Sequence, residues 1–503
     1  MDKIYKVSHT LSMQSWINQG LKNSLFSTFP KQLSILGHNS RGLLLVAGFI
    51  LPLFGCTVAE KPLPPAQVSG EIVVITRNSP TSYYENAEGA YIGLEHDLAA
   101  LFAEELGLKL RFIVARRFDE IIPILERQQA HFAAAGLSIT PARESKVRFS
   151  VPYQSVQQQV VFNTDYKKPA SLKDLIGKRI SVVAGSSYAE RLKETKQQFP
   201  ELTWSEATSQ ETEELLDKVA ANTLDAVIAD SNIVDVAQNF YPTIGVAFEF
   251  GKPEQLAWAF PKNADPYLYE QSQLFFKKIQ QDGTLKRLID RYYGHVKRLD
   301  RPDIEGFLNK MHSTLPRFLH LFQQAQEITG VDWRLIAALG YQESHWDPLA
   351  TSPTGVRGLM MLTGDTADRM GVDNRLDPKQ SITAGAEYLL DMKDMIPARI
   401  SEPDRTWLAL AAYNVGYGHL EDARILAQRQ KLSSDIWTDL KKTLPLLSKF
   451  EHHSTLKHGY ARGGEPVIFV ENIRTYYDIL LKFEKPYKPV LPPFSSSLTA
   501  QAP

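Results

Sequence analysis

The segment around Glu343 is the place where the sequence most clearly offers a group that can do chemistry. It reads GYQESHWDPLA over residues 340–350 and follows the run VDWRLIAAL. In a helix, Ile336, Leu339 and Glu343 lie on one face, so a carboxyl group occupies a position of an apolar stripe. Either the stripe has reached solvent at the helix end, or apolar surroundings keep this acid protonated near neutral pH. In the second case Glu343 could donate a proton to a bond that breaks.

Three segments of the C-terminal half carry short patterns. ESHWDP (343–348) fits E-S-x-[FW]-[ND]-P, GVRGLMMLT (355–363) fits G-x-x-G-L-M, and LALAAYNVGYG (408–418) fits A-Y-N-x-G. In this order and spacing they resemble the catalytic domain of the soluble-type lytic transglycosylases. That resemblance implies an all-α, lysozyme-like fold that cleaves bacterial cell-wall glycan. One departure is Met361, which stands where the family often has Gln after G-L-M.

The same resemblance implies roles for individual residues. It implies that Glu343 is catalytic and that the substrate is bound by Ser344, Met360, Tyr413 and Asn414. Other uses stay open for three of these residues. The Ser344 hydroxyl could bond back to its own helix, Met360 could belong to the core, and Asn414 could cap a helix end. Tyr413 could bond either the acid or the sugar.

The number of carboxyl groups that could act in catalysis distinguishes hydrolysis of a glycosidic bond from its cleavage by a lyase. Common glycosidases use two, but Asp347 precedes a proline and reads as a turn residue, and Asp365 starts a helix and reads as a cap. A single acid suffices when the nucleophile belongs to the substrate. The C6 hydroxyl of N-acetylmuramic acid can attack its own C1 and give a 1,6-anhydro sugar. A lyase is therefore expected. The alternatives are a muramidase that hydrolyses with water, and a solute-binding sensor with an inactive C-terminal domain.

The upstream half alternates strands and helices. EIVVITR (71–77) predicts a buried strand, and the amphipathic run GLEHDLAALFAEEL after it predicts a helix that ends at Gly107. The strand-then-helix order recurs in KRISVVAG (178–185) and LDAVIAD (224–230). Such alternation favours an α/β domain with mainly parallel sheets.

Three segments of this half resemble the signature of periplasmic amino-acid-binding proteins. They are AAAGLSITPARESKVRFSVPY (133–153), DAVIAD (225–230) and QDGTLKRLIDRYYG (281–294). The resemblance implies two lobes that close on a ligand around a hinge. The two crossing strands would be QQVVFN (158–163) and QLAWAFP (255–261).

The binding-protein resemblance also implies a ligand with both a carboxylate and an ammonium group, as in an amino acid or a wall-derived stem peptide. Arg143 would grip the carboxylate through its planar guanidinium, and Asp230 would receive the ammonium. Ser138 and Thr140 would add hydroxyl and backbone contacts. The same residues permit a surface ion pair for Arg143 and a helix N-cap for Asp230.

The N-terminal region reads as an export signal. Arg41 precedes a mostly apolar run over residues 42–55 that ends at Cys56, the single cysteine of the chain. This length suits a signal peptide and is short for a membrane-spanning helix. LFGC (53–56) resembles a lipobox, although Phe54 is bulky. We expect a periplasmic protein at the inner face of the outer membrane, held by a lipidated Cys56 or by an uncleaved anchor.

Composition limits the remaining possibilities. The chain has 503 residues, which is too many for one core. Its formal net charge of −1 gives no field to hold nucleic acid. We find no metal-ligand spacing and no phosphate-binding glycine loop, so we expect no cofactor and no metal. Glycan strands of peptidoglycan are the expected partner, and the chain as a whole resembles modular, membrane-bound lytic transglycosylases. The expected parts are a signal peptide or anchor (1–56), a linker (57–69), a ligand-sensing domain (70–296), a second linker (297–313), a catalytic domain (314–485) and a disordered tail (486–503).

Overall fold

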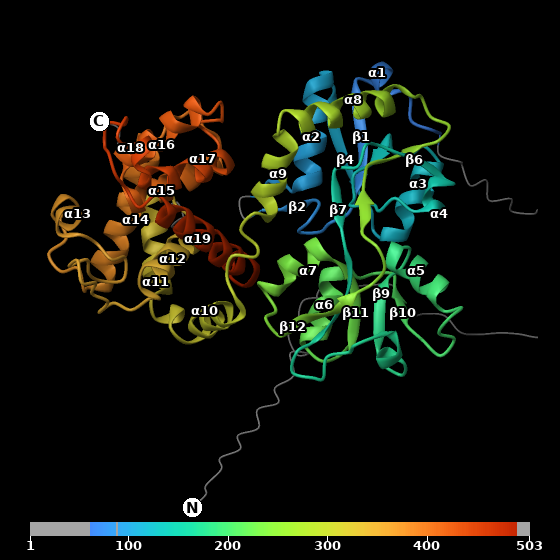
Figure 1. Ribbon diagram of the computed structural model, residues 1–503, viewed down its shortest axis with the longest axis horizontal. Coiled ribbons are helices and arrows are strands. Elements are labelled where there is room, and N and C mark those ends of the chain that lie inside the picture. Colours follow the sequence, from blue (N-terminus) through green and yellow to red (C-terminus); the bar gives the residue numbers. More distant parts are fainter. Residues whose placement is uncertain (1–60, 87–88, 490–503) are drawn as a thin grey trace, which may run out of the picture. The chain divides into compact units, whose positions relative to one another are not determined.

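The computed structural model describes residues 61–86 and 89–489. The expected signal peptide with Cys56, the first residues of the following linker and most of the expected tail lie outside the described residues. Two halves follow one another along the described chain. The first is built from strands and helices, and the second is built from helices (Figure 1).

The first lobe of the α/β half is built on a five-stranded sheet in the order β4-β1-β5-β14-β6. Its strands are β1 (Glu71–Thr76), β4 (Lys109–Val114), β5 (Phe132–Ala133), β6 (Val147–Phe149) and β14 (Ala259–Pro261). β1 runs parallel to β4 and β5, and β14 runs antiparallel to its neighbours. Helix α2 (Leu94–Leu106) packs on β1 and β4. Trp258 lies at the centre of the core, with its ring 4.6 Å from that of Phe132.

The second lobe has a five-stranded sheet in the order β10-β9-β11-β8-β12. Its strands are β8 (Gln158–Asn163), β9 (Ile180–Val183), β10 (Ser205–Ala207), β11 (Ala226–Asp230) and β12 (Ile244–Glu249). Its helices are α5 (Ser187–Thr195), α6 (Thr212–Ala220) and α7 (Ser231–Gln238). β9 pairs in parallel with β10 and β11, whereas β8 is antiparallel to β11. The predicted α/β class with two lobes is confirmed.

The crossing between the lobes lies slightly upstream of the predicted strands. β7 (Gln154–Val156) and β13 (Glu254–Leu256) form a two-stranded antiparallel ladder of their own. Residues 158–163 do form a strand, but they belong to the second sheet as β8. The pattern of apolar residues indicated strands in this region. It could not show which strand spans the lobes, because strand partners are set by tertiary pairing.

The smaller elements of this half complete the lobes and their edges. They are α1 (Ala66–Ser69), β2 (Tyr84–Glu85), β3 (Tyr91–Ile92), a 3-10 turn η1 (Phe118–Glu120), α3 (Ile121–Glu126), α4 (Pro141–Glu144), η2 (Leu172–Leu175), α8 (Tyr267–Gln281) and α9 (Thr284–Tyr293).

The second half is all-α, as predicted. Its helices are α10 (Arg301–Ser313), α11 (Leu319–Thr329), α12 (Trp333–Ser344), α13 (Gly364–Arg369), α14 (Pro378–Met395), α15 (Asp404–Val415), α16 (Tyr417–Arg429), α17 (Trp437–Thr443), α18 (Phe450–His453) and α19 (Gly464–Phe483), with 3-10 turns η3 (Leu315–Arg317) and η4 (Leu444–Ser448). α19 packs against α12 and α15, and α14 packs against α11 and α15. Sequence periodicity did not predict α17, which is short.

The segment expected to be the second linker is largely helical. α10 occupies residues 301–313, and its Ile304, Phe307 and Met311 are buried in the core of the helical half. The Phe307 ring lies 4.6 Å from the rings of Tyr341 and Tyr476. α10 therefore packs as part of the helical half.

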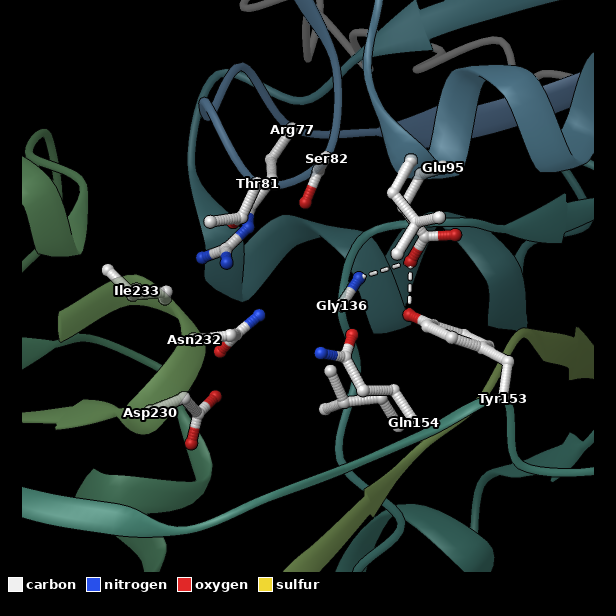
Figure 2. A pocket seen from close by; sticks show the side chains of 12 residues that line it. Arg77, Thr81, Ser82, Glu95, Gly136, Tyr153, Gln154, Asp230, Asn232 and Ile233 are labelled. Carbon is white, nitrogen blue, oxygen red and sulfur yellow. Dashed lines mark hydrogen bonds between the residues drawn. The ribbon is translucent and has the colours of Figure 1, made fainter. Parts of the chain in front are cut away.

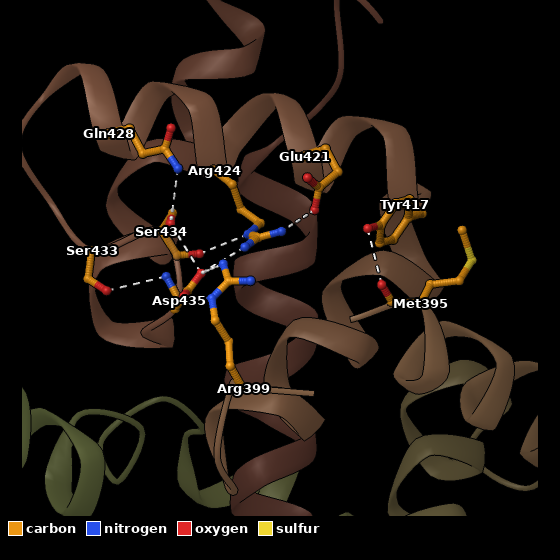
Figure 3. A network of polar contacts seen from close by, with 9 residues as sticks. All are labelled: Met395, Arg399, Tyr417, Glu421, Arg424, Gln428, Ser433, Ser434 and Asp435. Carbon is orange, nitrogen blue, oxygen red and sulfur yellow. Dashed lines mark hydrogen bonds and ion pairs between the residues drawn. The ribbon is translucent and has the colours of Figure 1, made fainter. Parts of the chain in front are cut away.

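A polar network pins the loop that follows α16 (Figure 3). The buried Arg424 donates to the carboxyl groups of Glu421 and Asp435 at 2.5 and 2.7 Å, and to the carbonyl oxygen of Ser434 at 3.0 Å. Arg399, from the loop before α15, pairs with the same Asp435 at 3.0 Å. The network thereby fixes α16, which begins directly after the A-Y-N-x-G segment.

Two glycines allow α12 and α14 to pack closely around Met360. A Cβ atom at Gly385 would lie 2.7 Å from the Met360 Cγ atom, and one at Gly340 would lie 2.9 Å from the Leu359 Cδ2 atom. Both distances are shorter than side chains tolerate. Because neither glycine has a side chain, the turn of residues 358–360, called the G-L-M turn below, can pack between these two helices.

We predict that Gly385→Ala destabilises the helical half by about 1–3 kcal/mol, because the added methyl group overpacks the Met360 site. The measurement is thermal unfolding of the full chain, followed by circular dichroism. Gly364→Ala is the matched control, since a Cβ atom there would meet nothing within 4 Å. Identical melting of Gly385→Ala and wild type would contradict the packing argument.

Candidate functional site

Glu343 lies in the last turn of α12, and the chain folds back immediately after it. The Asp332 side chain caps the start of the helix by accepting from the Arg334 backbone N–H at 2.8 Å. At the other end, His345 is exposed with φ of 52°, and Trp346 has φ of 59°. The Trp346 indole N–H donates to the Ala337 carbonyl at 2.8 Å. This reversal directs the chain toward the G-L-M turn, close to Glu343.

Glu343 is half-buried, and its carboxyl group has no ion-pair partner among the residues that the structure describes. Burial raises its pKa to about 8. At neutral pH the group therefore holds its proton. Of the two alternatives that the sequence left open, the structure favours an acid kept protonated by its surroundings. A general acid must be in this protonated state.

The other carboxyl groups of the segment lie in different surroundings. Asp347 is exposed, and its Oδ1 atom accepts from the Leu349 backbone N–H at 2.9 Å, as expected for a turn residue. Asp365 is exposed in the first turn of α13, and Thr363 rather than Asp365 supplies the N-cap. Neither resembles Glu343 in burial.

Tyr413 is positioned by the same turn. Its hydroxyl donates to the Met360 carbonyl oxygen at 3.2 Å, and its ring lies 5.0 Å from that of Tyr388. Burial, and next the charge of Glu343, raise the pKa of Tyr413 well above its usual value. Tyr413 is thus a neutral hydroxyl close enough to Glu343 to interact with its charge.

The other three predicted substrate contacts, Ser344, Asn414 and Met360, differ from one another in burial and hydrogen bonding. The Ser344 hydroxyl donates to the Leu359 carbonyl at 2.7 Å and reaches that of Gly340 at 3.3 Å, so it ties α12 to the G-L-M turn. Asn414 is exposed at the end of α15. Met360 is fully buried, which corrects the expectation that its side chain contacts substrate. Its side chain is enclosed between α12 and α14.

Residues that the sequence did not indicate hold the G-L-M turn in place. The buried Ser381 hydroxyl accepts from the Met360 backbone N–H at 3.1 Å. Arg375 donates to the carbonyl oxygens of Gly355 and Leu362, both at 2.9 Å. A Cβ atom at Gly358 would lie 1.8 Å from the Arg375 carbonyl oxygen, so only glycine fits there. No local pattern marks Ser381 or Arg375, because both act across the fold.

A second candidate site lies in the α/β half, where two small cavities adjoin the lobe crossing. Arg77 and Asp230 line both cavities, and Ser138 and Arg143 line one of them. Figure 2 shows the cavity around Arg77, Glu95 and Asp230. The structure thus brings together three of the four predicted ligand-binding residues.

Arg143 is buried and fully engaged, so it is no surface ion pair. Its guanidinium donates to Glu190 of α5 at 3.1 Å, and to the carbonyl oxygens of Ser138 and Gly185, both at 3.0 Å. Thr140 caps α4 and also donates to Glu190 at 2.8 Å. These contacts join the two lobes, since Ser138 and Glu190 lie on opposite sides of the crossing.

Asp230 occupies the N-cap position of α7, but its side chain makes no capping hydrogen bond. Burial raises its pKa to about 6. Arg77, which the sequence did not indicate, lies at the end of β1 and pairs with Glu211 across the cleft at 3.4 Å. A lone arginine after a strand carries no signal, and only the closed cleft brings it to the site.

Among residues 61–86 and 89–489, no helix combines the length and apolar character needed to cross a membrane. The same residues contain no cluster of His, Cys, Asp and Glu side chains that could hold a metal ion.

Comparisons with known proteins agree with this two-part construction. Residues 72–295 match the model of bacterial extracellular solute-binding proteins, family 3, and residues 320–436 match the transglycosylase SLT domain. Among solved structures, the chain resembles a mutant of the arginine-binding protein of T. maritima, with 22% identity, a TM-score of 0.42, and coverage of 46% of this chain and 97% of that one. An ancestral arginine-binding protein bound to arginine is 26% identical over 44% of this chain and 98% of its own, with a TM-score of 0.41.

Full-length relatives share both parts in one chain. The membrane-bound lytic murein transglycosylase F of Methylobacillus flagellatus is 52% identical over 90% of this chain and 96% of its own length. That of Nitrosospira multiformis is also 52% identical, over 89% of this chain and 93% of its own. The chain therefore belongs to the family of membrane-bound lytic murein transglycosylases F.

Proposed function

We propose that the helical half cleaves the β-1,4 bond between N-acetylmuramic acid and N-acetylglucosamine without consuming water, and leaves a terminal 1,6-anhydro sugar. The observation that carries this proposal is Glu343, a half-buried acid whose pKa of about 8 keeps it protonated at neutral pH. The binding-protein half would act as a ligand-sensing module.

In the first step Glu343 gives its proton to the glycosidic oxygen as the bond from that oxygen to C1 breaks. N-acetylglucosamine then leaves with a hydroxyl group, and positive charge develops at C1 of the muramic acid. In the second step the C6 hydroxyl oxygen attacks C1, and its proton passes to the Glu343 carboxylate. The acid is regenerated, and no water enters.

The burial of Glu343 supports both steps. A carboxylate formed in an apolar wall is poorly stabilised, so it takes a proton more readily than an exposed carboxylate would. The same group can therefore be an acid toward the leaving oxygen and a base toward the C6 hydroxyl. Tyr413, neutral and anchored on the Met360 carbonyl, would orient the acid or the sugar.

Hydrolysis by a muramidase remains the alternative for this fold. It would require a second group to activate water or to hold the sugar, usually a carboxylate within about 5–9.5 Å of the first. Asp347 and Asp365 are exposed and serve a turn and a helix start, so neither supports that chemistry.

For its location, we propose that the chain is periplasmic and attached to the inner face of the outer membrane. The membrane-bound relatives support this, as does the apolar run that ends at Cys56. Lipidation of Cys56 is our proposed means of attachment.

For its control, we propose that a ligand in the cleft alters cleavage by closing the two lobes. The last turn of α9 and the residues that follow it, 291–296, contact both lobes. The Tyr292 hydroxyl donates to Asp97 of the first lobe at 2.6 Å, and Asn239 of the second lobe donates to the Val296 carbonyl at 2.9 Å. A change in lobe closure would therefore move or strain this segment.

The same segment is bonded to α19. His295 pairs with Asp478 at 2.6 Å, and Arg474 donates to the Arg291 carbonyl at 2.5 Å. α19 in turn packs against α12, which carries Glu343. A continuous set of contacts thus joins the cleft to the catalytic helix, which is a physical route for coupling.

The test of the chemistry is digestion of purified murein with wild type and with Glu343→Gln, followed by mass spectrometry. Wild type should release muropeptides with 1,6-anhydro ends, one water lighter than the reducing-end products of a hydrolase. Reducing ends alone would make the chain a muramidase. No release by a folded, murein-binding wild type would support the sensor alternative.

Glu343→Gln should lower turnover by at least about 10²-fold, because the amide has nearly the same shape but cannot donate the proton. Asp347→Asn and Asp365→Asn are the matched controls and should keep most of the activity. A folded Glu343→Gln variant with near-normal turnover would remove Glu343 from its assigned role.

We expect kcat/KM for murein to fall as the pH rises through about 8, the pKa that burial gives to Glu343. The sign follows because the free enzyme needs the protonated acid, which is present below this pKa and lost above it. The measurement is initial rate at low substrate from pH 3 to 10 at constant ionic strength. A fall centred near pH 4.5, the ordinary value for Glu, would show that the acid is not shielded.

A stem peptide should change the cleavage rate by about 5- to 150-fold at most, the usual range for coupling between two sites. Arg143→Ala should remove this response, because Arg143 holds Glu190 across the cleft. The measurement is murein turnover with and without peptide for both proteins. If calorimetry shows saturating peptide on wild type and turnover is unchanged, the module does not control cleavage.

A further inference from the structure

A carboxylate of the second lobe is held by two donors of the first lobe. Glu190 lies in the first turn of α5, and its Oε1 atom accepts from the Arg143 Nε–H group at 3.1 Å. Its Oε2 atom accepts from the Thr140 hydroxyl at 2.8 Å. Arg143 lies on α4, and Thr140 is the N-cap of that helix. A guanidinium and a hydroxyl that converge on the two oxygens of one carboxylate form a carboxylate-binding site.

The two donors of this site are also held within their own lobe. The Arg143 Nη1 atom donates to the Ser138 carbonyl oxygen at 3.0 Å. The Thr140 hydroxyl oxygen accepts from the Arg143 backbone N–H at 3.3 Å, which fixes the side chain of Thr140 at the start of α4. These bonds do not depend on Glu190. The donors would therefore stay in place for another carboxylate if Glu190 moved away.

Glu190 is the partner that can leave. Its side chain is 29% exposed, whereas that of Arg143 is 5% exposed. The start of a helix favours negative charge, so α5 also stabilises the Glu190 carboxylate after it has left Arg143. A carboxylate that arrives from solvent can thus compete with Glu190 for the same two donors.

Two neighbouring contacts show the same division between the lobes. At the start of α6 in the second lobe, Glu211 accepts from the Arg77 Nη1 atom at 3.4 Å, and Glu213 accepts from the Ser79 hydroxyl at 2.5 Å. Arg77 and Ser79 follow β1 in the first lobe. Acids of the chain itself therefore join the lobes, and two small cavities lie beside these contacts.

We propose that Glu190 is an internal ligand of the cleft. Its carboxylate occupies the binding site formed by Arg143 and Thr140, holds the two lobes together there, and is replaced by the free carboxylate of an external ligand. The apparent affinity of such a ligand then scales with the fraction of chains in which the site is open to it. This inference rests on the proposed ligand-sensing function of the α/β half, and it adds the group that a ligand must displace.

The test is hydrogen–deuterium exchange of the full chain, measured by mass spectrometry on the peptide of residues 138–146. Glu190→Ala should speed the exchange of this peptide about tenfold or more, because two hydrogen bonds to a charged carboxylate are lost. The peptide lies on the opposite lobe, so the substitution leaves its own sequence unchanged. Glu194→Ala is the matched control, since Glu194 is an exposed acid of the same helix, and it should exchange like wild type.

Alanine favours the helical state, so α5 should persist in Glu190→Ala. Glu190→Gln is a second variant of nearly the original shape. It should also speed the exchange, because a neutral amide binds a guanidinium less strongly than a carboxylate does.

Acetate is the probe for the carboxylate-binding site. In Glu190→Ala, sodium acetate should slow the exchange of the peptide toward the wild-type rate in a saturable manner. Acetamide has nearly the same shape but no charge, and it should not slow the exchange. Sodium chloride keeps the ionic strength constant. Wild type should respond to neither probe, because Glu190 already fills the site.

Wild-type exchange in both Glu190 variants would overturn the inference, as would equal slowing by acetate and acetamide, or slowing by neither. The response of murein cleavage to a stem peptide is measured on the same preparation of wild type. Slowing by acetate without that response would overturn the proposed control of cleavage alone. A response to the peptide without slowing by acetate would overturn this inference alone.

Discussion

The burial of one carboxyl group without a partner is the constraint on which the catalytic half depends. An ionised acid in an apolar wall is destabilised by several kcal/mol when no counter-charge is present, so Glu343 keeps its proton. That condition holds only while the groups around it keep water and cations away. The reversal at His345 and Trp346, the seated G-L-M turn and Tyr413 together build this surrounding.

The packing of the helical half serves the same purpose. Gly340 and Gly385 let two helices close on Met360, and Ser381 bonds the backbone of that residue. The carbonyl of Met360 then anchors Tyr413. Residues of α12 and α14 thus fix the position of Tyr413 through the backbone of Met360, because a closely packed interior transmits small displacements.

The two halves of this lytic transglycosylase use acids in opposite ways. In the helical half, burial keeps Glu343 protonated near neutral pH. In the α/β half, Glu190 and Glu211 pair with Arg143 and Arg77 and so help to join the two lobes.

The amino-acid sequence alone predicted the order of the two halves, their fold classes and Glu343 as the candidate acid, because these predictions depend on local features. Periodicity sets the type of an element, and the E-S, G-L-M and A-Y-N-x-G segments set local backbone shape. The α10 helix was not predicted, and residues 301–313 were expected to be a linker. Its few apolar residues form no clear local pattern, and Phe307 is buried by contacts with Tyr341 and Tyr476, which lie far away in the sequence.

The contacts of the side chains at the two sites follow from tertiary packing. It buried Met360 instead of presenting it to the sugar, and engaged Arg143 across the lobes. It also brought Arg77 to the cleft and Ser381 to the turn. Burial and hydrogen-bond partners come from segments far apart in the chain. A carboxyl pKa or an unpartnered oxygen is a property of that packing, and no local pattern encodes it.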